Sequence, residues 1–169
     1  IEKLMRSKTY GKLRYIISNW KHPSLKKNNN QYIKKAGNGF WFDGASYLLS
    51  FDNYFFKGKK RFIKQYIKKN IALRGSITCN SNKISRYYFW GEGQSYKNDL
   101  ELFFEKATIY VEQFFAKRLT DIIKLKVYTN FSIKEKIVKN DNQFYLMFKD
   151  IYLNYNKNKY QNYHRNKII

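Results

Sequence analysis

The stretch GEGQSYKNDLELFF, residues 91–104, decides whether this chain is built around a nucleotide-binding loop or around a sheet. A phosphate-binding glycine loop lies between a strand and the N-terminus of a helix, where free backbone N–H groups point at the anion. Residues 86–90, RYYFW, favour a strand, but the residues after the loop also alternate as in a strand. No Gly-Lys-Ser/Thr sequence and no third glycine at dinucleotide spacing follow. We therefore expect Gly91 and Gly93 to let the chain bend between two strands without binding a nucleotide.

The charge of the chain is strongly positive. It has 34 Lys and Arg residues against 12 Asp and Glu, a formal net charge of +22. Such an excess indicates a polyanionic partner, although membranes and acidic proteins are also anionic. Aromatic residues make up 20% of the chain, which is enough for a packed core and argues against a disordered basic tail.

Cysteine and histidine are scarce. Cys79 is the only cysteine, which rules out an intrachain disulfide, and we expect it to be a small buried residue of a strand. His22 and His164 lie near opposite ends, so we expect no metal site, no histidine-based catalytic centre and no cofactor. No run of about eighteen apolar residues occurs, so we expect no membrane insertion.

Hydrophobic periodicity predicts a mixed series of elements. The segment 46–52, SYLLSFD, reads as a buried strand, and 56–75 as an amphipathic helix ended by Gly75. The remaining expected elements are strands at 76–79, 86–90 and 100–111, a helix at 112–128, a strand at 131–137 and a short helix at 144–155. Residues 76–79 and 86–90 should pair as a β-hairpin.

This order predicts an α+β fold: a ferredoxin-like split β-α-β sandwich with a long protruding β-hairpin, over residues 46–137. Residues 1–45 show no sustained period and read as a basic N-terminal arm, and 138–169 as a basic, Asn-rich C-terminal extension. The arm is either a solvated linker or an ordered segment lying on RNA. Large rings favour the second: Trp20, Tyr32, Trp41 and Phe42.

From about Ser46 to Ile137 the chain resembles the S-ten family of small-subunit ribosomal proteins. SFD resembles the end of that family's first strand, SITC and RYYFW its long hairpin, and GEGQSYKNDLELF its Gly-Glu-Gly and Asp-x-x-x-Phe sequence. Residues 121–137 resemble its last helix and final strand. The hairpin tip lacks the family's prolines. The family's His-Lys-Arg-Leu run corresponds either to residues 108–111 or to 116–123.

The resemblance implies a structural constituent of the ribosome, a non-enzymatic rRNA-binding protein that functions in translation. Its expected partners are small-subunit rRNA and neighbouring proteins of the S-three and S-fourteen families in the subunit head, with no small-molecule substrate. Residues spelled by AT-rich codons dominate, which favours the mitochondrial matrix over a plastid or the cytosol. The competing functions are an accessory subunit of an organelle membrane complex, a free RNA-binding or transcription factor and, least favoured, an RNA-modifying enzyme.

Candidate RNA-binding residues are the cations of the predicted helix, the hairpin and the loops after it. They are Lys59, Lys60, Lys64, Lys68, Lys83, Arg86, Lys97, Lys117 and Arg118. Tyr87, Tyr88, Phe89 and Trp90 supply rings for stacking or protein packing, or else alternate ones simply build the core. The scattered carboxylates predict caps and ion-pair partners rather than catalysis: Asp43, Asp52, Glu92, Asp99, Glu101 and Glu105.

Overall fold

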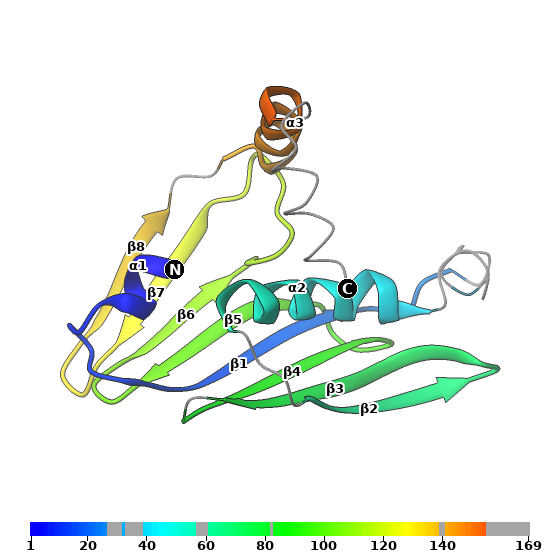
Figure 1. Cartoon of the computed structure of the whole chain (residues 1–169), viewed down its shortest axis with the longest axis horizontal. Helices are drawn as coiled ribbons and strands as arrows, with labels where there is room; N and C mark the ends of the chain where they lie inside the picture. The colour runs from blue at the N-terminus through cyan, green and yellow to red at the C-terminus, as the bar shows by residue number, and fades with distance from the viewer. Residues whose placement is uncertain (27–31, 33–38, 57–60, 82, 139–140, 155–169) are drawn as a thin grey trace.

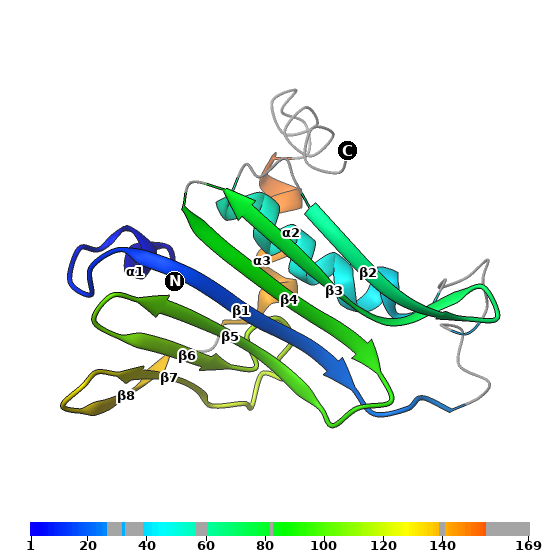
Figure 2. The same cartoon turned by 90° about the horizontal axis from the view of Figure 1, so that it is seen from below.

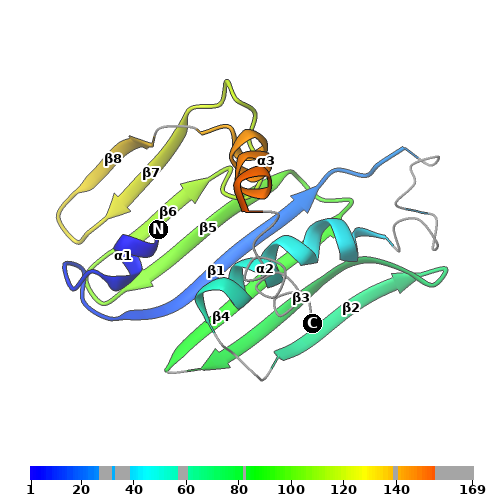
Figure 3. The same ribbon diagram turned by 45° about the horizontal axis from the view of Figure 1, so that its top comes forward.

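The computed structural model describes residues 1–26, 32, 39–56, 61–81, 83–138 and 141–154. Within them the chain forms one eight-stranded sheet in the order β2-β3-β4-β1-β5-β6-β7-β8 (Figure 2). One face of the sheet is crossed by a helix, α2 (Figures 1 and 3). The elements are α1 (Glu2–Arg6), β1 (Leu13–His22), the π-helix η2 (Trp41–Ala45), α2 (Ser46–Phe55), β2 (Arg61–Lys68), β3 (Ile71–Ser81), β4 (Ile84–Glu92), β5 (Lys97–Phe104), β6 (Thr108–Glu112), β7 (Ile123–Tyr128), β8 (Ile133–Val138) and α3 (Gln143–Asn154).

The centre of the sheet is β1, which pairs parallel with β4 and antiparallel with β5. The other neighbouring strands are antiparallel. The glycine stretch connects β4 to β5, and it passes the end of β1 because β1 lies between them. The expected bend between two strands is therefore confirmed. Gly93 has a φ of 75°, a conformation that favours glycine.

The core lies between α2 and the sheet. Alternate residues of the central strands point toward the helix, among them Ile16 of β1 and Tyr88 of β4, both fully buried. The helix contributes Leu48 and Phe51, three residues apart and thus on one side of α2. Cys79 of β3 is buried in the same cluster, as expected.

The ferredoxin-like sandwich is wrong. That fold has a smaller sheet with two helices on one face, whereas this chain has an eight-stranded mixed sheet with few helices. The hairpin of β3 and β4 is confirmed, but it does not protrude. Its strands are flanked by β2 on one side and by β1 on the other, so both edges of the hairpin are paired within the sheet.

Residues 46–52 form the first turns of α2, not a strand. A short apolar run suits a buried strand and a buried helix equally, and its length does not distinguish them. Leu48, Phe51 and Asp52 are buried while Ser50 and Asn53 are exposed, which is a helical spacing.

Residues 61–81 form the hairpin β2–β3, not the predicted helix. The turn is made by Lys69 and Asn70, whose φ angles are 51° and 62°. Positive φ at both central residues is the requirement of a tight hairpin turn. Phe62 and Ile67, placed in the predicted helix core, are exposed on the edge strand β2.

The predicted helix at 112–128 is also wrong: residues 113–122 form a loop and β7 follows. The buried amide of Asn98 holds this loop. Asn98 accepts a hydrogen bond from the Phe115 backbone N–H (2.9 Å) and donates one to the Ala116 carbonyl (2.7 Å). The single strand expected at 100–111 is two, β5 and β6, joined by a turn. The strand at 131–137 and the C-terminal helix are confirmed as β8 and α3.

Residues 1–45, predicted to form a basic N-terminal arm, contribute α1 and β1, and β1 pairs with β4 and β5 at the centre of the sheet. In β1 the residues Ile16, Ser18 and Trp20 are buried at every second position. None of the helices that the structure describes has the length and apolar character needed to cross a membrane.

Candidate active site

An imidazole and a carboxylate meet where the two parallel strands end. His22, the last residue of β1, is the register partner of Glu92, the last residue of β4. The carboxyl ends of parallel strands are where open sheets bind ligands. Both residues are half-buried. The ring of His22 lies 5.4 Å from that of the buried Phe40, which directly precedes η2.

Tyr32 completes this group. Its hydroxyl donates a hydrogen bond to a carboxylate oxygen of Glu92 at 2.9 Å and lies 3.4 Å from the Leu25 carbonyl. Burial raises the pKa of Tyr32, and the hydrogen bond to Glu92 raises that pKa further. The phenol is therefore held protonated, as a hydrogen-bond donor.

The geometry of His22 defines which ring nitrogen is available. Nδ1 lies 3.0 Å from the carbonyl oxygen of Pro23. A carbonyl only accepts hydrogen bonds, so this contact requires the proton on Nδ1 and leaves Nε2 of the neutral ring as an acceptor. A hydrogen-bond donor, the Tyr32 hydroxyl, and an acceptor, His22 Nε2, thus flank the same strand ends. Together they can hold a hydroxyl group of a ligand.

Aromatic rings border this group on the helix side of β1. Trp20 lies two residues before His22, and its ring is 5.2 Å from Tyr47 of α2 and 6.1 Å from Phe115. The indole Nε1 of Trp20 is buried and has no acceptor among the residues that the structure describes. Tyr47 and Tyr96 are exposed. An unpaired buried donor beside exposed tyrosines is consistent with a ligand that brings acceptors of its own.

The glycine stretch forms the rim of this site. The backbone N–H of Gln94 donates to the carbonyl of His22 at 3.2 Å, which ties the stretch to the end of β1. A side chain at Gly93 would come within 3.3 Å of the Ser24 hydroxyl. The glycines thus let the loop lie close over the strand end.

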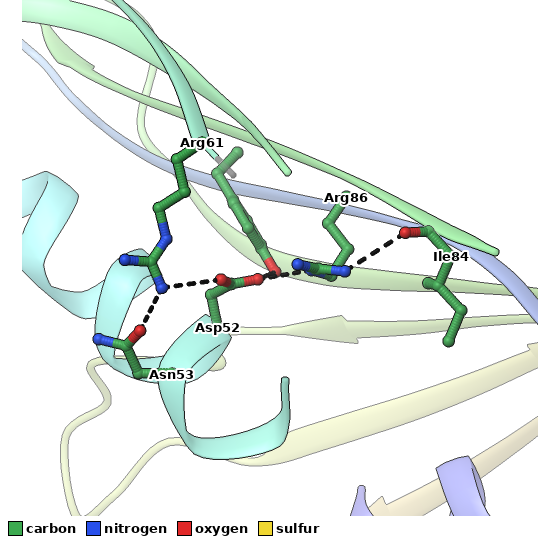
Figure 4. A network of polar contacts seen from close by, with 6 residues as sticks. Asp52, Asn53, Arg61, Ile84 and Arg86 are labelled. Atoms are coloured by element: carbon green, nitrogen blue, oxygen red, sulfur yellow. Dashed lines mark hydrogen bonds and ion pairs between the residues drawn. The ribbon is translucent and has the colours of Figure 1, made fainter. Parts of the chain in front are cut away.

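A second polar group lies at the other end of α2 and is structural (Figure 4). Asp52 is fully buried and accepts hydrogen bonds from Arg86 Nε (2.6 Å), the Tyr88 hydroxyl (2.9 Å) and Arg61 (3.2 Å). Burial, followed by the charge of Asp52, raises the pKa of Tyr88. Arg86 also packs 4.5 Å from the ring of Phe56. These contacts join α2 to β2 and β4 and leave no room for a ligand at Arg86.

The residues predicted to bind RNA do not form one surface. Lys59 and Lys60 lie outside the described residues. Lys64 and Lys68 are exposed on β2, Lys83 is exposed in the β3–β4 turn, and Lys97 pairs with Asp99 and Glu101 of its own strand. Lys117 and Arg118 line a hollow beside Tyr96, where Arg118 pairs with Asp121 at 2.9 Å. Arg86 is buried, so it cannot contact a polynucleotide.

The four rings of β4 alternate between the two faces of the sheet. Tyr88 and Trp90 are buried against the helix, while Tyr87 and Phe89 are partly exposed on the open face. Of the two alternatives that the sequence left open for these rings, this burial agrees with the one in which alternate rings build the core.

None of the three residues of the candidate site is predicted from the sequence as an active-site residue. The scarcity of histidine predicts no catalytic centre at His22, Tyr32 is read as a ring of an arm lying on RNA, and Glu92 as a cap or ion-pair partner. No local pattern predicts a strand that ends at His22, and the parallel pairing that makes His22 and Glu92 neighbours has no local signature.

Comparisons with known proteins identify related structures but no family. No family model matches the chain, and no curated protein matches it. A point mutant of KijD10, a 3-ketoreductase from Actinomadura kijaniata in complex with TDP-benzene and NADP, matches 90% of this chain and 48% of its own, with 12% identity and a TM-score of 0.81.

Two further matches are to oxidoreductases that are named for sugars or sugar nucleotides. The aldose–aldose oxidoreductase from Caulobacter crescentus matches 84% of this chain and 45% of its own, with 11% identity and a TM-score of 0.68. UDP-N-acetylglucosamine 3-dehydrogenase GnnA from Acidithiobacillus ferrooxidans matches 82% and 44%, with 12% identity and a TM-score of 0.57. The chain spans less than half the length of the structures it matches.

These matches overturn the ribosomal interpretation. The matched structures named above are oxidoreductases, not S-ten proteins, which contradicts the expected ribonucleoprotein role, the rRNA and ribosomal-protein partners and the expectation of a non-enzymatic protein. The neighbours bind NADP or are named for sugar and sugar-nucleotide substrates, against the expectation of no small-molecule substrate. They support neither the membrane-complex nor the transcription-factor alternative. The short segments that resemble the S-ten family belong to a different fold in this chain, the eight-stranded sheet described above.

The residues of this chain do not fit a dinucleotide cofactor. A dinucleotide fold places Gly-x-Gly-x-x-Gly between a parallel strand and a helix, and the sequence contains no glycines at that spacing. The sheet has a single parallel pair among its named strands, and the glycine stretch after β4 leads into strand β5 rather than a helix.

Proposed function

We propose that this chain forms the sugar-binding part of an NAD(P)-dependent oxidoreductase, with the dinucleotide held outside the residues described here. The observation that carries the proposal is the match of 90% of the chain to KijD10 at a TM-score of 0.81. The sugar substrates named for the other matched oxidoreductases support the same substrate class.

The candidate active site is suited to a sugar. His22 Nε2 accepts a hydrogen bond from a sugar hydroxyl, and the Tyr32 hydroxyl can turn from Glu92 to donate to a sugar oxygen. The exposed rings of Tyr47 and Tyr96 provide flat apolar faces with hydroxyl tips, which suit the alternating C–H and O–H faces of a pyranose.

Binding of unphosphorylated sugars by the full chain tests this proposal. Saturation-transfer NMR with N-acetylglucosamine and glucose should show transfer from the protein to the ring protons of at least one sugar. His22→Ala and Tyr32→Phe should each weaken the apparent affinity about fivefold to tenfold, because each removes one hydrogen bond to the ligand.

Tyr128→Phe is the matched control. Tyr128 is a partly exposed tyrosine at the end of β7, away from the carboxyl ends of β1 and β4 where the candidate site lies. This variant should bind sugar as the unaltered chain does. The proposal is wrong if neither sugar receives saturation, or if Tyr32→Phe and Tyr128→Phe behave alike. NADP⁺ titrated into the chain should give no saturable binding at the same strand ends, seen as unchanged sugar affinity.

A further inference from the structure

A cavity lies at the opposite end of the parallel strand pair from His22. Its volume is about 760 Å³, and it is bordered by α1, the start of β1, the end of α2 and Lys83 of the β3–β4 turn. The ten residues of β1 separate it from His22, roughly 30 Å at 3.3 Å per residue. One sugar nucleotide is shorter than that, so a single ligand does not fill both places.

The lining of the cavity combines apolar and cationic side chains. The apolar ones come from four elements and their ends: Met5, Leu13, Tyr54, Phe55, Phe56 and Ile84. The cations are Arg6, Lys12, Arg14 and Lys83, and Glu2 is the only acidic residue of the lining. The ring of Tyr54 is 58% exposed, and the ring of Phe55 lies 4.8 Å from it in an edge-on arrangement.

Two of the four cations form ion pairs with carboxylates. Arg6 pairs with Glu2 at 2.6 Å, and Arg14 pairs with Glu105. The backbone N–H of Lys12, ahead of Arg14, lowers the pKa of Glu105, so that carboxylate stays charged. Lys12 and Lys83 have no ion-pair partner among the residues that the structure describes. Their ammonium groups are the ones that an anion in the cavity would meet.

Lys83 has a left-handed backbone conformation. Its φ is 64°, in the left-handed region that glycine or asparagine adopts at lower cost. Lys83 lines the cavity, so this turn places a positive charge beside it.

We propose that this cavity binds a nucleoside phosphate, with the base against the exposed ring of Tyr54 and the phosphates between Lys12 and Lys83. The volume suits a nucleotide-sized ligand. Exposed rings stack with any base, and lysines bind phosphate as point charges. This inference does not depend on the sugar-binding proposal.

Titration of the full chain with mant-ADP, a fluorescent nucleoside diphosphate, tests the site. Saturable binding should weaken about tenfold in Lys83→Asn and in Lys12→Ala, since each loses one charged contact to phosphate. Lys83→Asn also lowers the cost of the left-handed backbone conformation at this position. The denaturation midpoint of this variant should therefore stay equal or rise while its affinity for mant-ADP falls. A purely structural lysine would not show these opposite changes.

Lys134→Asn is the matched control, because Lys134 is an exposed lysine of the far strand β8. ADP should displace the probe better than inorganic tripolyphosphate or decyl phosphate. The proposal is overturned if mant-ADP binding does not saturate, or if Lys83→Asn and Lys134→Asn lose equal affinity for the probe. It is also overturned if tripolyphosphate or decyl phosphate displaces the probe as well as ADP does. Lys83→Asn should leave sugar binding intact, and Tyr32→Phe should leave mant-ADP binding intact, so the two proposals fail separately.

Discussion

Asp52 is the residue on which the packing of α2 most depends. Its carboxylate is fully buried and receives hydrogen bonds from two arginines and a tyrosine that come from β2 and β4. Taking charges out of water is costly unless each has partners. The network as a whole therefore adds little to the free energy of unfolding, but removing one member leaves the other charged groups buried without a partner.

The substitution Asp52→Ala should lower the free energy of unfolding by about 3–5 kcal/mol, because it leaves the charge of Arg86 buried without a carboxylate. Denaturation by urea measures the change. Glu112→Ala, an exposed acidic residue at the end of β6, should change it by less than about 0.5 kcal/mol. Similar losses in the two variants would show that Asp52 is not an essential partner.

Among the elements, the β2–β3 hairpin shows how a turn overrides a helical pattern. The segment 61–73 has apolar residues at helical spacing, yet Lys69 and Asn70 adopt positive φ and reverse the chain. Pairing with β3 joins β2 to the sheet edge, where its exposed rings and lysines alternate. Pairing with β3 satisfies the backbone groups of β2 that face β3, and the groups on the outer edge are satisfied by solvent.

The double substitution Lys69→Asn and Asn70→Gly should raise the free energy of unfolding by about 1 kcal/mol, since both residues favour left-handed conformations. Thermal unfolding followed by circular dichroism checks it. Lys64→Asn, in the middle of β2, places the same residue type in an extended conformation and should lower stability. A gain in both variants would contradict the turn-based explanation.

For the whole molecule, stability is expected to be greatest at the centre of the sheet. β1 has strands on both sides and α2 over one face, while β2 and β8 are edge strands whose residues are mostly exposed. Local opening follows burial and contact density, so the edges open first.

Hydrogen–deuterium exchange with mass spectrometry should therefore find the slowest amides in β1, β4 and β5. Amides of β2 and β8 should exchange at least tenfold faster, because edge strands open without disrupting the core. The β3 peptides serve as an internal control of intermediate protection. Faster exchange in β1 than in β2 would contradict the strand order.

The candidate site also depends on the arrangement of the whole sheet. His22, Tyr32 and Glu92 are separated by up to 70 positions in the sequence, and they meet only because β1 and β4 are parallel neighbours. The sequence predicted a strand at 86–90, which lies within β4, and the glycine bend after it. It could not predict which strand would lie next to β4, because parallel partners are joined by long crossovers without a local signal.

The sequence by itself determined the features that depend on nearest neighbours: the hairpin of β3 and β4, the alternation of its rings, the bend at Gly93, strand β8 and helix α3. Tertiary structure alone decided the helix at 46–55, the hairpin in place of a helix at 61–73, and the loop held by Asn98. The reason is physical. A short apolar segment can bury its side chains equally well as helix or strand, and only distant partners select between them. The same distant pairing buried Arg86, which charge alone had placed on the surface.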